Sequence, residues 1–150
     1  MPIESVADAM LAGDFQEATE RARRVNEVQN LMGLTVVRHD SEATGVTMEL
    51  TDRVRGTVDG TVHGGLLATL ADVTSAFSLT GAFDTESEIP VTTDLHIRYY
   101  RQPRSGPVLA EAKVVHKGKR LLSVECSVVD AEERALARAT ATYMLVPRPA

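Results

Sequence analysis

The spacing of hydrophobic and polar positions changes several times along the chain. Between Asp14 and Met32, apolar residues recur every three or four positions with charged residues between them: Phe15, Ala18, Ala22, Val25, Val28 and Leu31. This spacing predicts one amphipathic helix, which Gly33 would end. We therefore expect residues 1–32 to form an amino-terminal helical extension and residues 33–150 to form the main domain.

A β-branched pattern replaces the helical one after Gly33. Residues 34–37 and 46–50 are rich in valine and threonine and are separated by a short polar segment, which predicts two strands joined as a hairpin. Residues 51–61 contain aspartate, arginine and glycine without an apolar period. We expect an exposed loop there, and such loops often carry function.

The most apolar helical pattern runs from Gly65 to about Thr80. One stripe holds the larger side chains, namely Leu66, Leu67, Leu70, Val73, Thr74 and Phe77, and the reverse face holds small ones, namely Ala68, Ala71 and Ser75. A helix that is apolar or small on every side is typically enclosed by the rest of the fold. The pattern therefore predicts a central helix.

Four strand-like segments follow, over residues 91–100, 108–116, 121–130 and 135–146. Polar or glycine-containing turns separate them, and alternation gives each strand one buried face. The inward positions that we expect in the last segment are mostly alanine, with two larger residues after them: Ala135, Ala137, Ala139, Ala141, Tyr143 and Leu145. Small side chains let a helix approach a sheet closely, so the sequence predicts an α+β fold in which an antiparallel sheet wraps around the central helix.

Composition narrows the possible classes of function. The chain has 150 residues, a net charge of −5 and no lysine or arginine run longer than two, which gives little support to nucleic-acid binding. The amino terminus lacks a signal-peptide pattern and no segment could span a bilayer, so we expect no membrane association and a cytoplasmic location. Cys126 is the only cysteine, and the four histidines share no ligand spacing, so neither a disulfide nor a metal site is expected.

One carboxylate stands out within the central helix. From Gly64 to Phe83 the only charged residue is Asp72. Burying an unpaired carboxylate is costly, so such a residue is usually paired, hydrogen-bonded or retained for a chemical task. It could instead cap another segment or form a buried salt bridge at a subunit contact.

The helix that contains Asp72 is preceded by His63 and begins with two glycines. Its free N–H groups could stabilise the oxyanion of an acyl-transfer reaction, because helix N-termini bind anions. A Gly-Gly pair more often marks a turn or tight packing. The position of Asp72, about two turns after Gly64, strengthens the functional interpretation.

The segment Val62-His-Gly-Gly-Leu-Leu-Ala-Thr-Leu-Ala-Asp72 resembles the signature of hotdog-fold thioesterases related to the phenylacetate-pathway enzyme and to 4-hydroxybenzoyl-CoA thioesterases. The resemblance extends over residues 30 to 147. It implies hydrolysis of an acyl-CoA thioester in a site shared between two subunits, by a dimer or a dimer of dimers. It implies no cofactor apart from the coenzyme A of the substrate.

The resemblance also implies roles for individual residues. Asp72 matches the catalytic nucleophile or general base, Gly64 matches the backbone donor to the thioester carbonyl, and His63 is a weaker catalytic candidate. The expected substrate-binding residues are Thr57, Gly65, Thr92 and Thr93. A basic hairpin tip formed by Lys117, Lys119 and Arg120 could bind the phosphates of coenzyme A, although it could equally be a solvated turn.

Thr57 departs from the family pattern. Many relatives carry Asn or Gln at that position, six residues before the histidine, and threonine cannot donate an amide hydrogen bond. The departure leaves open a second hypothesis, a non-catalytic module that binds acyl-CoA or lipid. A hotdog dehydratase fits less well, because the histidine-bearing loop expected of that class is not recognisable.

Overall fold

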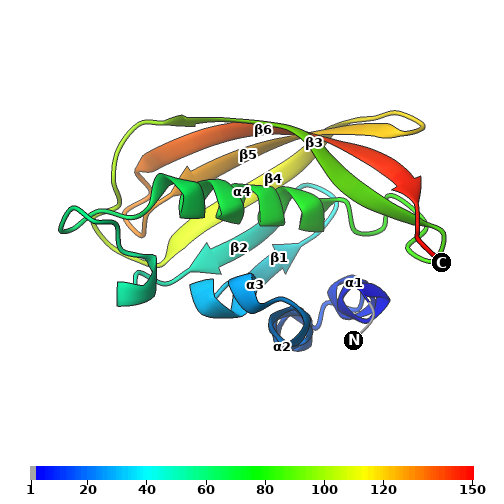
Figure 1. Cartoon of the computed structure of the whole chain (residues 1–150), viewed down its shortest axis with the longest axis horizontal. Helices are drawn as coiled ribbons and strands as arrows, with labels where there is room; N and C mark the ends of the chain where they lie inside the picture. The colour runs from blue at the N-terminus through cyan, green and yellow to red at the C-terminus, as the bar shows by residue number, and fades with distance from the viewer. Residues whose placement is uncertain (1–2) are drawn as a thin grey trace.

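The computed structural model describes residues 3–150, which form a six-stranded sheet and one long helix against it (Figure 1). The elements in chain order are α1 (Ile3–Leu11), α2 (Phe15–Val25), α3 (Glu27–Met32), β1 (Thr35–His39), β2 (Thr44–Met48), the 3₁₀ helix η1 (Asp52–Val54), α4 (Gly64–Ser78), β3 (Glu88–Tyr99), β4 (Val108–Lys117), β5 (Leu121–Val129) and β6 (Ala135–Pro147). Within residues 3–150, no helix is both long and apolar enough to cross a membrane.

The strand order of the sheet is β1-β2-β4-β5-β6-β3, and every neighbouring pair is antiparallel. The chain leaves the β1–β2 hairpin, runs through α4 and then enters the opposite edge of the sheet as β3. The sheet curves around α4 (Figure 1). This arrangement is the hotdog fold, so the predicted fold class is confirmed.

The core lies between α4 and the concave face of the sheet. The alternation predicted for β5 is confirmed, because Leu122, Val124, Cys126 and Val128 are all buried. In β6 the buried set begins with Leu136 rather than with Ala135, which is exposed, since the register shifts between Val128 and Val129 of β5. The small inward side chains of β6 allow the close approach of α4 that the sequence predicted.

The buried face of α4 differs from the predicted stripe of large side chains. Leu67, Leu70, Ala71, Thr74 and Ser75 face the sheet most closely. Three of the predicted residues, Leu66, Val73 and Phe77, are only half-buried at the sides of the helix. Leu67, Leu70 and Thr74 of the predicted stripe are buried, and the small residues Ala71 and Ser75 complete the face that packs closely against the sheet.

The amino-terminal region differs most from its prediction. The single helix expected from Asp14 to Met32 is wrong, because the chain breaks at Asn26, where φ is −136°. The Asn26 side chain accepts a hydrogen bond from the Gln29 N–H and caps α3, and asparagine favours a cap over a helix interior. The break leaves Val25, Val28 and Leu31 about half exposed.

Helix α1 lies within the predicted helical extension, but the hydrophobic pattern did not predict it as a separate helix. Residues of α1 to α3 share one hydrophobic core with the sheet and α4, and the buried ones are Val6, Ala9, Met10, Ala18, Ala22 and Met32. The chain turns between α1 and α2 at Gly13, which has a φ of 76°. The division into an extension over residues 1–32 and a domain over residues 33–150 stays a prediction.

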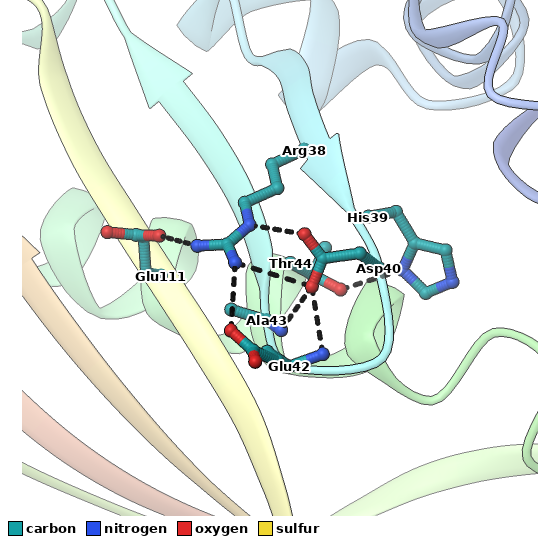
Figure 2. Close-up of polar contacts among 7 residues, drawn as sticks. All are labelled: Arg38, His39, Asp40, Glu42, Ala43, Thr44 and Glu111. Carbon is teal, nitrogen blue, oxygen red and sulfur yellow. Dashed lines mark hydrogen bonds and ion pairs between the residues drawn. The ribbon is translucent and has the colours of Figure 1, made fainter.

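A network of charged side chains fixes the turn between β1 and β2 (Figure 2). The Asp40 carboxylate accepts hydrogen bonds from the N–H groups of Glu42 and Ala43 and from the Arg38 guanidinium. Arg38 also binds Glu111 of β4, with a distance of 3.0 Å between Nη1 and Oε2. The hydrogen bond from Arg38 and those from the turn hold the pKa of Asp40 well below its ordinary value.

Candidate active site

Asp72 lies in the middle of α4 and is half-buried. Two hydroxyl groups donate hydrogen bonds to its Oδ1 atom, Tyr143 Oη at 2.7 Å and Thr92 Oγ1 at 3.0 Å. Among residues 3–150, no side chain donates to its Oδ2 atom and no cation forms an ion pair with it. One carboxylate oxygen is therefore held in place, and the other is available to a ligand.

Tyr143 is the site residue that sequence reasoning missed. The sequence placed it correctly on the inward face of the last strand, but only as part of the core. Its phenol also lies 2.9 Å from the Asp72 carbonyl oxygen. Burial, together with the hydrogen bond to Asp72, raises the pKa of Tyr143 well above its ordinary value, so the phenol stays a donor. A buried tyrosine needs a hydrogen-bond partner, and that requirement was the available signal.

Strand register brings Thr92 to the same carboxylate. Thr92 of β3 pairs with Tyr143 of β6, so the two hydroxyls converge on Asp72 from neighbouring strands. The register shifts between Thr92 and Asp94, and the Thr93 hydroxyl there donates to the Thr142 carbonyl at 3.1 Å. Of the two predicted threonines on β3, only Thr92 donates a hydrogen bond to Asp72.

The start of α4 has the geometry expected of an anion site. His63 is the N-cap residue, and its carbonyl accepts hydrogen bonds from the N–H groups of Leu66 and Leu67. The N–H groups of Gly64 and Gly65 precede any helical acceptor, as at every helix start. Tyr99 of β3 anchors this end by donating to the Gly64 carbonyl at 2.6 Å. The His63 side chain is exposed and makes no capping hydrogen bond.

Gly64 and Asp72 of one chain are too far apart to act on the same carbonyl group. They are eight residues apart in one helix, which corresponds to about 12 Å along its axis. A nucleophile and an oxyanion donor must both lie about 3 Å from the reacting atoms. The two predicted catalytic groups are thus held on one rigid helix but at separate ends of it.

An apolar cavity of about 360 Å³ opens beside Asp72. Val73, Ala76 and Phe77 of α4 line one side of it, and Phe83 and Ile89 line another. Volumes of about 300–1,000 Å³ are typical of ligand pockets, which are mostly apolar with a few polar groups. The carboxylate therefore stands at the wall of a space that can hold an apolar group.

The remaining predicted site residues lie elsewhere. Thr57 is exposed in the loop before α4. The basic tip of Lys117, Lys119 and Arg120 is exposed at the β4–β5 turn. Lys117 pairs with Leu122, which pairs with Tyr143, so Lys117 lies two strands, or about 10 Å, from that tyrosine. Within residues 3–150, no three His, Cys, Asp or Glu side chains are grouped so as to hold a metal ion.

Comparison with known proteins gives the family. The model of the thioesterase superfamily matches residues 59–137, a range that includes α4 and Asp72. A protein of Saccharolobus solfataricus that is named as an esterase is 22% identical over 119 residues, which cover 79% of this chain and 77% of that protein. A second protein with an esterase name, from Halobacterium salinarum, is 36% identical over 86 residues, which cover 57% of this chain and 56% of that protein.

Solved structures agree on the fold. A thioesterase of Haemophilus influenzae superposes with a TM-score of 0.80 at 18% identity, covering 89% of this chain and 90% of that one. The PaaI protein from the phenylacetic acid degradation operon of E. coli superposes with a TM-score of 0.72 at 20% identity, covering 85% of this chain and 89% of its own. The family model matches more than half of the residues of this chain, so the chain belongs to the thioesterase superfamily.

Proposed function

We propose that this protein hydrolyses an acyl-CoA thioester to a free acid and coenzyme A, with Asp72 as the residue that activates or delivers the attack. The observation that carries the proposal is the Asp72 carboxylate itself, which is held by two hydroxyls on one oxygen, free on the other and open to an apolar cavity. The proposed reaction needs no cofactor beyond the coenzyme A of the substrate.

The chemistry can follow either of two routes. As a general base, Asp72 takes a proton from water while the water oxygen attacks the carbonyl carbon, and the C–S bond then breaks to release the thiol. As a nucleophile, Asp72 attacks the same carbon, the C–S bond breaks to release the thiolate of coenzyme A, and water then hydrolyses the resulting mixed anhydride to the free acid and the restored carboxylate. Tyr143 and Thr92 support both routes because they orient the carboxylate.

The oxyanion donor in this proposal is the Gly64 N–H of a second copy of the chain. The helical distance between Gly64 and Asp72 excludes the donor of the same chain. Strand β3 offers the means of assembly, since it is an edge strand whose residues 91–94 are all exposed. An unpaired edge is a template for another strand.

Antiparallel pairing of two β3 strands would bring the required groups together. Thr92 of β3 binds Asp72, and Tyr99 near the other end of the same strand binds Gly64. If a two-fold axis passes between them, near Leu95 and His96, Thr92 of one copy faces Tyr99 of the other. Each Asp72 then lies toward the helix start of the opposite copy. We therefore propose a homodimer as the smallest active unit.

Steady-state hydrolysis of a panel of acyl-CoA thioesters tests the proposal, with release of free thiol as the signal. Wild type is compared with Asp72→Asn and with the control Glu125→Gln, which changes an exposed carboxylate on β5, away from the proposed pairing edge. We expect activity in wild type and in the control, and a loss of about 10³-fold or more in Asp72→Asn. Wild-type rates in the Asp72→Asn protein would contradict the proposed role.

Thr57 favours a second candidate, a module that binds acyl-CoA without turnover. Its position in the exposed loop before α4 provides no amide donor where many relatives have one. The same panel separates the two functions. Binding of acyl-CoA without hydrolysis above background, in wild type as in Asp72→Asn, would establish the binding module and exclude the enzyme.

A further inference from the structure

The cavity beside Asp72 is bounded by two helices that are far apart in the sequence. On α4 and just beyond its end, Asp72, Val73, Ala76, Phe77 and Thr80 line the cavity, and their spacing puts them on one helical face. The cavity therefore runs from the carboxylate toward the carboxyl end of the helix. It leads away from Gly64 of the same chain, at the other end of α4.

The opposite wall is formed by α1, the helix that the sequence pattern did not predict. Val6, Ala7 and Met10 line the cavity, and their spacing of one and three residues places them on one face of α1. Val6 and Met10 are buried. The Thr80 hydroxyl lies 3.7 Å from the Met10 sulfur atom, which ties α1 to the segment after α4.

The lining defines the chemistry of the group that the cavity can accept. Apart from Asp72, the described lining residues carry no charge: they are apolar side chains with Gln29, Thr80 and Thr85 among them. A second carboxylate would lose its hydration there without an ionic partner, which is strongly unfavourable, and an ammonium group could find a partner only in Asp72, which the proposed function assigns to the thioester. The group is therefore uncharged and mainly apolar.

The volume sets the size of that group. A water-sized unit occupies about 30 Å³ of a liquid, so a cavity of about 360 Å³ holds roughly ten such units once imperfect filling is allowed for. If each carbon takes up about one such unit, the cavity accommodates an unbranched acyl chain of about eight to ten carbons or an arylalkanoyl group of similar size. Phe77 and Phe83 offer aromatic surfaces to either kind of group.

We infer that this cavity is the acyl-binding pocket and that the substrates of the protein are medium-chain or arylalkanoyl thioesters. In this inference, Ala7 and Met10 of α1 set the size of the acyl group that the pocket accepts. The inference rests on the proposed function, since it takes Asp72 as the residue that meets the thioester. Thr80, which contacts Met10, marks the far end of the α4 face. Changes in α1 should alter which acyl group is accepted without altering the reaction.

Filling and enlarging the pocket from α1 provides the test. Ala7→Leu adds three carbons to the lining, and Met10→Ala removes two carbons and the sulfur. Asp8→Leu is the matched control, because Asp8 lies on the same helix, is exposed and does not line the cavity. The full-length variants are assayed with saturated acyl-CoAs of increasing chain length and with phenylacetyl-CoA.

We expect the ratio of kcat/KM for a ten-carbon over a four-carbon acyl group to fall about tenfold or more in Ala7→Leu, since each buried methylene changes affinity about fourfold. The optimum should move to longer chains in Met10→Ala, and the control should keep the wild-type profile. A wild-type chain-length profile in both Ala7→Leu and Met10→Ala would overturn the inference and leave the proposed hydrolysis standing. Circular dichroism melting confirms that each variant is folded.

A failure of the proposed function gives a different result. If wild type hydrolyses none of the thioesters, the same panel is measured by isothermal titration as binding affinity. A preference for medium chains that moves to shorter chains in Ala7→Leu supports the pocket even then. Affinities that do not depend on chain length, or that Ala7→Leu leaves unchanged, overturn it.

Discussion

Asp72 and Asp130 are two carboxylates of the same fold that differ in how many of their oxygens accept hydrogen bonds from the protein. Asp130 follows β5, its side chain is fully buried, and both of its oxygens accept hydrogen bonds: the N–H groups of Arg104, Glu132 and Arg134 and the Arg134 guanidinium all donate. Asp72 receives two neutral hydroxyls on one oxygen only. We call the Asp130 carboxylate saturated, because both of its oxygens accept hydrogen bonds from the protein. The Asp72 carboxylate is not saturated in this sense.

The difference separates a structural carboxylate from a chemical one. Burial by itself would raise the pKa of Asp130, but its hydrogen bonds with the backbone and with Arg134 outweigh that effect and bring the pKa to about 2. No atom of a saturated carboxylate is left for a substrate. Asp72 is oriented by Tyr143 and Thr92 yet keeps one free oxygen beside a cavity, as a general base or nucleophile must.

Exchanging each carboxylate for its amide should have opposite consequences, and this is the largest effect that we expect. Asp72→Asn should lose about 10³-fold or more in kcat and keep its melting temperature within about two degrees, since the amide fills the same space. Asp130→Asn should keep kcat in the folded protein but melt several degrees lower, because its buried donors face an amide. Thiol release and thermal melting, measured on both proteins, check the pair. If both variants lost activity and stability to the same extent, the distinction between a structural and a chemical carboxylate would not hold.

The hydroxyls that hold Asp72 should contribute unequally. Tyr143→Phe removes a buried donor at 2.7 Å and should lower kcat about tenfold or more, since water cannot readily take its place. Thr92→Val removes the longer of the two hydrogen bonds, at 3.0 Å, and should lower kcat only a few-fold, since Tyr143 still holds the same oxygen. KM should change little in either variant. If Thr92→Val proved as damaging as Tyr143→Phe, Thr92 would have a role beyond orienting Asp72.

The stabilising effect of Asp130 should depend on pH. Its pKa is lower in the folded protein than the ordinary value of 3.8, so its contribution is fully present above about pH 4 and is lost as the pH falls toward 2. The melting temperatures of wild type and Asp130→Asn should therefore differ most near neutral pH and converge in acid. If the difference in melting temperature between the two proteins widened on acidification, the folded-state pKa of Asp130 could not be lower than its ordinary value.

Asp40 provides the smallest effect. Its carboxylate is also bonded by a guanidinium and two N–H groups, but it is exposed at the β1–β2 turn, where solvent screens the charges (Figure 2). Asp40→Asn should lower the melting temperature by about one or two degrees at neutral pH, and less in strong acid. An effect as large as that of Asp130→Asn would show that saturation matters more than burial.

Local patterns were enough to predict the elements that position the site. The apolar run after Gly64 predicted α4, alternation predicted the last strands, and the isolation of Asp72 marked it as a candidate. The break at Asn26 could not be read from periodicity, because the apolar spacing continues through it and only the capping preference of asparagine opposes it.

The contact between Asp72 and Tyr143 was out of reach for a different reason. It depends on the register of β3 against β6 and on the closeness of α4 to the sheet, which are long-range properties of the packed fold. The cavity depends likewise on α1, whose place against the segment after α4 no local pattern encodes. Residue types indicated which groups could act, and only packing shows which of them meet.

The most direct test of the shared site mixes two inactive proteins. Gly64→Pro removes the proposed N–H donor, and the site tolerates the change because His63 has the extended conformation favoured before proline, with φ −54° and ψ 126°, and proline suits a first helical position. Gly64→Ala is its control, since it keeps the N–H and its Cβ would lie 3.5 Å from the Tyr99 ring, an ordinary contact.

Asp72→Asn and Gly64→Pro are unfolded together in equal amounts, refolded and assayed for hydrolysis. If each site takes Asp72 from one copy and Gly64 from the other, a mixed dimer regains one intact site, and the mixture should recover about a quarter of wild-type activity. No activity in the mixture above that of the separate variants, with mixed dimers shown to be present, would contradict the shared site.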